Sequence, residues 1–70
     1  MPYHVGQEVR VFDVNGSPED GWPGKVIMAG RRYATVTYRG RTAQFIAATG
    51  RINDIRDHQW IVVPDPPTEP

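Results

Sequence analysis

The sequence predicts a single all-β domain of five strands. Five segments rich in β-branched and aromatic residues favour this fold, clusters of turn-forming residues separate them, and no segment has the spacing of a long helix. The 70 residues include no cysteine, which excludes disulfide bonds and cysteine-based zinc sites. We expect residues 1–63 to form one small domain, stabilised further by self-association or by docking onto a partner, and residues 64–70, rich in proline, to form a disordered tail.

The first strand is expected over Gln7–Val14. Val9 and Val11 alternate there with charged neighbours, as in a strand with one buried face. A long loop is expected over Asn15–Gly24, because turn formers and acidic side chains dominate this stretch. The apolar segment Lys25–Ala29 then predicts the second strand.

The remaining strands are predicted by further apolar and β-branched segments. Tyr33–Tyr38 and Thr42–Ala47 are expected to continue a meander, since each has one apolar face. Ile52 and Ile55 lie three residues apart in a polar stretch, which predicts a single helical turn. Trp60–Val63 is expected to be a short last strand.

The alternation within these strands also predicts the hydrophobic core. Its expected members are Val9, Val11, Val26, Met28, Ala34, Val36, Phe45 and Ile61, capped by Ile52 or Ile55.

The order of these elements resembles that of the SH3-like small β-barrel group, in particular its KOW, Tudor and PWWP-type modules. Three segments carry the resemblance: the opening strand Gly6–Val11, the glycine-bounded stretch Asp20–Val26, and Tyr33–Tyr38 before the Arg39–Gly40 turn. The resemblance covers about residues 5–63. It implies a five-stranded SH3-like barrel that acts as a binding module, with its ligand face between the first loop and the loops joining the later strands.

Charge and hydrophobicity narrow the classes of function. Eight basic residues balance eight acidic ones, so the surface lacks the strong positive field of a dedicated nucleic-acid-binding domain. The longest apolar run, Val26–Ala29, is far shorter than the roughly 20 residues of a membrane span, and the N-terminus lacks a signal-peptide pattern. We therefore expect a soluble, cytoplasmic protein without a membrane partner. Arginine outnumbers lysine, which is typical of a GC-rich genome such as that of an actinobacterium or one of its phages.

Acidic and aromatic residues around the first loop form the leading candidate contact surface. Its expected members are Trp22, Asp13, Glu19, Asp20, Tyr38 and Trp60. An acidic groove with an aromatic floor is the arrangement that SH3-type surfaces use for basic or proline-rich peptides. Alternatively, Trp22 folds back as a lid over the open end of the barrel. The leading interpretation is a module for protein interaction or assembly, whose partner is another protein or a second copy of the chain.

The alternative interpretation is a nucleic-acid-binding accessory domain that uses basic residues and a tyrosine. Its candidate residues are Arg31, Arg32, Arg39, Arg41 and Tyr33. The third strand separates the two arginine pairs by six residues, roughly 20 Å at about 3.3 Å per residue, which places them at opposite ends of the barrel. A single basic patch would require the coiling of the sheet to bring Arg10 or Arg51 alongside one pair. Otherwise the arginines are solvated loop residues.

No combination of residues indicates catalysis or metal binding. Ser17, the one serine, lies in a predicted loop without a neighbouring histidine, and no glycine-rich phosphate loop precedes a helix. His4 and His58 are far apart in sequence and lack a firm third ligand. We therefore expect no enzymatic activity, no metal site and no cofactor.

Overall fold

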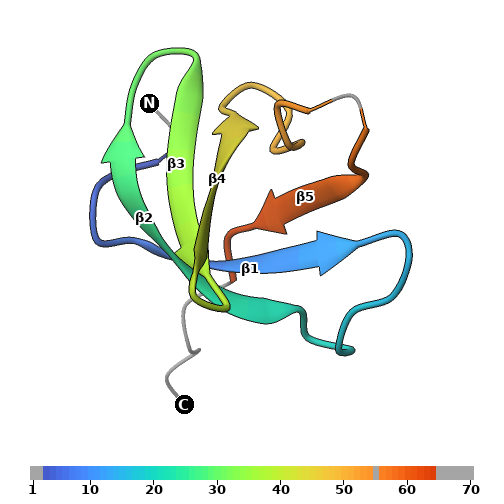
Figure 1. The fold of residues 1–70 in the computed structure, drawn as a ribbon. Helices are drawn as coiled ribbons and strands as arrows, with labels where there is room; N and C mark the ends of the chain where they lie inside the picture. The colour runs from blue at the N-terminus through green and yellow to red at the C-terminus, as the bar shows by residue number, and fades with distance from the viewer. Residues whose placement is uncertain (1–2, 55, 65–70) are drawn as a thin grey trace.

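The structure, a computed structural model, describes residues 3–54 and 56–64, and over these residues it contains five strands and no helix. The strands are β1 (Glu8–Asp13), β2 (Trp22–Ala29), β3 (Tyr33–Tyr38), β4 (Arg41–Ile46) and β5 (Gln59–Val62). They form one antiparallel sheet in the order β4-β3-β2-β1-β5, which curls into a half-barrel (Figure 1). The prediction of an all-β fold with five strands is confirmed. In the described part of the chain, no helix has the length and apolar character needed to cross a membrane.

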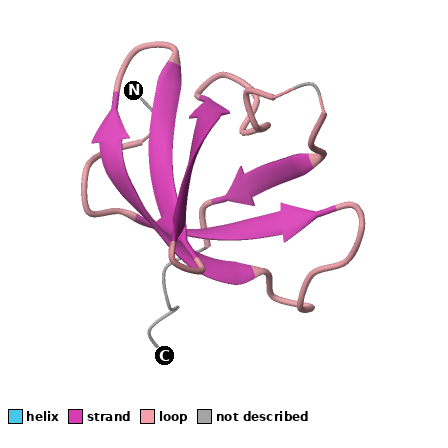
Figure 2. Cartoon of the chain, in the orientation of Figure 1, coloured by secondary structure: helices cyan, strands magenta, loops and turns pink. Residues whose placement is uncertain are grey.

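The stretch between β4 and β5 brings the two edges of the curled sheet together. Ile52 forms a β-bridge with Phe45 of β4, and Arg51 forms one with Trp60 of β5. These bridges satisfy backbone groups at both sheet edges and keep Arg51 and Ile52 extended. The chain then turns, and the Asp57 N–H donates to the Asp54 carbonyl at 3.2 Å. The described residues contain no helix at the predicted helical turn, and Ile55, its expected second member, lies outside them. The loops that connect the strands are visible in Figure 2.

β2 begins earlier than the sequence predicted, at Trp22, so the expected loop Asn15–Gly24 is too long by three residues. Residues 22–25 pair with β1, and Gly24 is the first β2 residue that pairs with β3. The Val26 N–H donates to Gln7 on the β1 side, so strand alternation points the Pro23 nitrogen away from β1 and past the end of β3. A proline at this position therefore removes no hydrogen bond from the sheet.

The core lies inside the half-barrel and largely matches its prediction. Seven of the expected residues are buried: Val9, Val11, Val26, Ala34, Val36, Phe45 and Ile61. Ile52 is partly buried and packs against this core. Tyr38 is buried with it as well, at 4% exposure.

Met28 is the exception, since it is 65% exposed and the prediction that it belongs to the core is wrong. A β-bulge between Val26 and Met28 interrupts the pairing of β2 with β3. The extra residue shifts the alternation of the strand, so Val26 and Ala29 face the core while Ile27 and Met28 face outward.

The Pro-rich tail predicted for residues 64–70 lies outside the described residues except for its first residue, Pro64, which is exposed.

Candidate functional site

Aromatic, cationic and polar side chains gather at one end of the half-barrel. Side chains from the end of β1, the start of β2, the turn between β3 and β4, and the start of β5 contact one another at this end, which we call the mouth. The mouth cluster comprises Asp13, Trp22, Tyr38, Arg39, Arg41 and Gln59. Strand pairing explains why these residues meet, because Trp22 lies opposite the buried Val11 and Gln59 lies opposite Asp13, so their side chains share the inner face of the sheet.

A chain of hydrogen bonds fixes the polar part of the mouth cluster. The Tyr38 hydroxyl donates to Oε1 of Gln59, and Nε2 of Gln59 donates to Oδ2 of Asp13 at 2.9 Å. Oδ1 of Asp13 accepts the N–H of Asn15 at 2.8 Å. The bond from Gln59, followed by that from Asn15, holds the pKa of Asp13 below its ordinary value, since both stabilise the charged carboxylate. These hydrogen bonds therefore fix the orientation of the polar side chains in the mouth cluster.

Two arginines lie over the aromatic rings of the mouth cluster. The rings of Trp22 and Tyr38 are 6.4 Å apart between centroids and tilted by 30°. The Cζ atom of Arg39 lies 4.6 Å from the centroid of Trp22, and that of Arg41 lies 5.9 Å from the centroid of Tyr38. Both distances fall within the range of cation–π attraction. Trp22 is thus held between the core, against which it packs, and the guanidinium of Arg39.

The predicted contact residues are only partly brought together. Tyr38 lies beside Trp22, but it is buried and offers little ring surface. Trp60 belongs to another surface, where it stacks on Phe12 at 5.7 Å with the ring planes 12° apart. These two rings pair across β1 and β5 on the outer face of the sheet.

The acidic residues of the predicted groove have separate surroundings. Glu19 and Asp20 are exposed in the loop between β1 and β2. Asp13 is engaged by Gln59 and Asn15. The side chain that covers Trp22 is therefore a cation, where the sequence suggested carboxylates.

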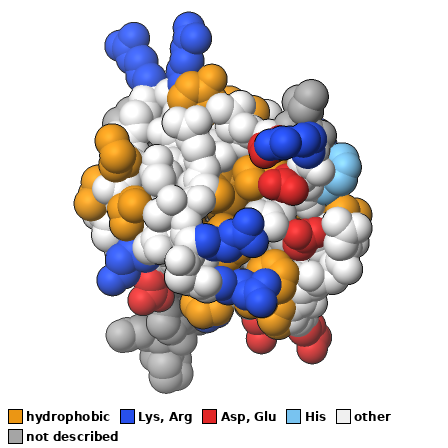
Figure 3. Space-filling view, viewed as in Figure 1, with side chains coloured by type: hydrophobic (Ala, Val, Ile, Leu, Met, Phe, Trp, Pro, Cys, Tyr) orange, Lys and Arg blue, Asp and Glu red, His pale blue; other side chains and the backbone are white. Residues whose placement is uncertain are grey.

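The two arginine pairs of the alternative site lie at opposite ends of β3, as their spacing predicted. Arg31 and Arg32 occupy the turn before β3, and Tyr33, at 38% exposure, starts that strand beside Ile46. In Figure 3, basic side chains project at the top of the view, and others border a hydrophobic strip near its centre. The five candidates of the alternative site therefore do not form one surface.

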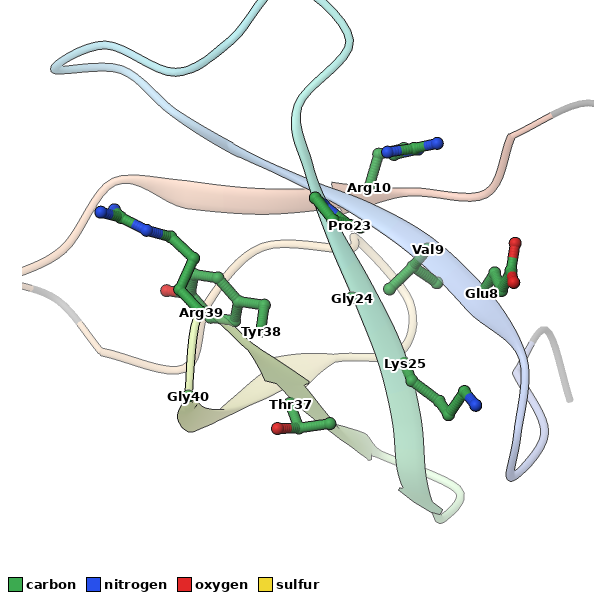
Figure 4. Close-up of a pocket in the computed structure, with 10 residues that line it drawn as sticks. All are labelled: Glu8, Val9, Arg10, Pro23, Gly24, Lys25, Thr37, Tyr38, Arg39 and Gly40. Atoms are coloured by element: carbon green, nitrogen blue, oxygen red, sulfur yellow. The ribbon is translucent and has the colours of Figure 1, made fainter.

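The outer face at the mouth carries a second group of cations. Arg10, Lys25 and Arg39 line a depression of about 480 Å³ that also contacts Glu8 (Figure 4). A single basic patch was expected only if the coiling of the sheet brought Arg10 or Arg51 alongside one arginine pair. Arg10 and Arg39 line the same depression, but their side chains lie on opposite sides of Pro23 (Figure 4), so they do not form one continuous patch.

Gln59 is the functional candidate that the sequence analysis missed. It is separated from Asp13 by 46 positions and reaches it only because β5 pairs with β1. Its place two residues before the buried Ile61 was the available signal, because residues two apart in a strand share a face.

Within residues 3–54 and 56–64, no three His, Asp or Glu side chains are grouped so that they could hold a metal ion. Comparisons with protein-family models, curated proteins and solved structures found no match to this chain. The mouth cluster presents aromatic rings, two guanidinium groups and hydrogen-bonding side chains.

Proposed function

We propose that this chain is a non-enzymatic binding module of the SH3-like barrel class, and that its mouth cluster binds an extended segment of a protein partner. The order of strand, long loop, three meandering strands and short last strand supports the assignment to this class. The curled sheet and the stretch that joins its edges support it further.

One observation carries the proposal: the mouth presents tryptophan and arginine side chains that are already held in place. Trp22 packs against the core beneath Arg39, and Tyr38 is fixed by its hydrogen bond to Gln59. Tryptophan, tyrosine and arginine are the residue types that dominate binding energy at protein interfaces. Because these side chains are ordered before a partner arrives, binding loses less conformational entropy.

The distribution of charge favours a protein partner over nucleic acid. Arg31 and Arg32 lie a full strand away from Arg39, so the cations do not follow one continuous phosphate backbone. Glu19 and Asp20 are exposed in the loop that leads to Trp22, where they would repel a polyanion. A peptide with both acidic and basic side chains suits this mixture better.

The proposal is tested by selecting binders from a displayed library of random peptides. Selected peptides should lose at least about tenfold in affinity for a Trp22→Leu variant, which keeps apolar packing but lacks the indole. Trp60→Leu is the matched control, because Trp60 lies on the outer face and its replacement should leave affinity within about twofold. Circular dichroism checks that both variants fold. Failure to enrich any peptide, or equal losses in both variants, would contradict the proposal.

A second copy of the chain is the other protein partner we consider. Light scattering across a concentration series tests it, and a Trp22-dependent dimer would make the mouth a self-association surface.

A nucleic-acid-binding accessory domain is the second candidate function, because Arg10, Lys25 and Arg39 line one depression. In that case affinity for single- or double-stranded nucleic acid should fall steeply with salt, and Arg10→Ala should reduce the salt slope by about one. Absence of binding at low salt would rule this candidate out.

A further inference from the structure

Arg39 occupies a backbone conformation that is unfavourable for its residue type. Its φ is +54°, and that of Gly40 is +75°, so both central residues of the two-residue turn between β3 and β4 have positive φ. Asparagine, aspartate and glycine are the residues that such turns favour, because other L-residues are crowded there. A strained residue of this kind points to a role for its side chain.

The strained turn holds the guanidinium of Arg39 on the ring of Trp22. Cation–π attraction acts between the guanidinium group and the ring and does not consume the N–H donors of the arginine. The Cζ atom of Arg41 lies farther from its ring, 5.9 Å from the centroid of Tyr38. Among the described residues, neither arginine side chain makes a hydrogen bond, so the donors of both cations are available.

Neither cation is neutralised by a carboxylate in the described part of the chain. The one ion pair there joins Arg56 to Asp54. Asp13, the acidic member of the mouth cluster, accepts hydrogen bonds from Gln59 and Asn15.

Arg10 and Lys25 line the same depression as Arg39. In Figure 4 the side chain of Arg39 lies on the opposite side of Pro23 from that of Arg10, so these cations are separate from the guanidinium that lies over Trp22. Glu8 is the one acidic side chain of this lining.

We propose that Arg39 and Arg41 form an anion-binding site for a carboxylate side chain within the extended segment of the protein partner, whose other charged side chains are of both signs. The inference rests on the proposed function, since it names the chemistry that the mouth recognises. Guanidinium and carboxylate groups match in geometry and form strong paired hydrogen bonds. The strained backbone at Arg39 is then maintained because it presents a donor group to the partner.

The test uses capped peptides of about ten residues, in which glycine alternates with glutamate, with glutamine or with lysine. They are titrated at low ionic strength into the isotope-labelled chain, with the Trp22 indole and Arg39 Nε resonances as readouts. The glutamate peptide should bind at least about tenfold more tightly than the glutamine peptide, as expected for hydrogen bonds to a charged group. Arg39→Asn should weaken the glutamate peptide by a similar factor.

Arg31→Asn is the matched control, because it removes the same charge at the other end of β3. It should change affinity by less than about twofold if the site is local. The melting temperature of Arg39→Asn should equal or exceed that of the wild type, because asparagine suits a positive φ. A loss of binding therefore cannot be attributed to unfolding.

Four results would overturn the inference. Equal losses in Arg39→Asn and Arg31→Asn would show only diffuse charge attraction. If Arg39→Asn binds the lysine peptide more tightly than the wild type does, then Arg39 occupies a site that takes a cation of the partner. Tighter binding of an oligothymidylate than of the glutamate peptide, with the same dependence on Arg39, would identify phosphate as the ligand. If library-selected peptides require Trp22 but bind Arg39→Asn unchanged, the inference fails while the proposed function stands.

Discussion

Replacing Phe45 and Met28 by alanine, one at a time, tests the register of the sheet. Phe45 is 0% exposed at the centre of the core, and removing such a ring costs about 3–5 kcal/mol. A domain of 70 residues has a free energy of unfolding of about 4–10 kcal/mol, so Phe45→Ala should remove much of it. Met28 is 65% exposed because of the β-bulge, and Met28→Ala should change the free energy of unfolding by no more than about 0.5 kcal/mol.

Urea denaturation followed by far-UV circular dichroism measures both effects. For a domain of this size, each kcal/mol of lost stability lowers the melting temperature by about 4–8 °C, so the melting temperatures of the two variants should differ clearly. If strict alternation placed Met28 in the core, its replacement would instead cost about 2–5 kcal/mol. A loss above about 2 kcal/mol for Met28→Ala, or below about 1 kcal/mol for Phe45→Ala, would refute the register.

Two further predictions concern the packing of β2 and the hydrogen bonds of the mouth. The Cβ of alanine at position 24 would lie 3.0 Å from Cγ1 of Val36, so Gly24→Ala should lower the free energy of unfolding by about 1–3 kcal/mol. An unchanged melting temperature would contradict the tight pairing of β2 with β3. Asp13 has a lowered pKa in the folded state, so its contribution to stability is present above its unfolded pKa and is lost as the pH falls through the folded pKa. Gln59→Ala should raise the pKa of Asp13 toward its ordinary value in a carboxyl NMR titration, because it removes the principal hydrogen bond. An unchanged pKa would show that Gln59 does not hold the carboxylate.

Most of the strands could be predicted because alternation and turn residues act locally. The bounds of β3 agree with the prediction, and those of β1, β4 and β5 differ from it by one residue at each end. The start of β2 could not be predicted, because Trp22–Gly24 has the composition of a loop and is strand only through its pairing with β1. The β-bulge could not be predicted either. All four residues of Val26–Ala29 are apolar, so no alternation of apolar and polar residues shows which of them face the core.

The site was predicted in part for similar reasons. Trp22 and Tyr38 were expected on one surface, Trp22 as an aromatic residue of the first loop and Tyr38 as the last residue of the third strand, and the two rings do lie together. The hydrogen bond from Gln59 to Asp13 depends on the pairing of β1 with β5, which local patterns do not specify. The position of Arg39 over Trp22 follows from the turn geometry, and the sequence indicated only that Gly40 would have a positive φ.

Chemical-shift perturbation, with a library-selected peptide titrated into the isotope-labelled chain, tests directly whether the mouth is the binding surface. If it is, the largest shifts fall on the mouth cluster, with the Trp22 indole N–H among them, and they disappear in Trp22→Leu. Shifts centred on Arg31 and Arg32 at the opposite end of β3, or on the outer face around Trp60, would contradict the claim that the mouth is the binding surface.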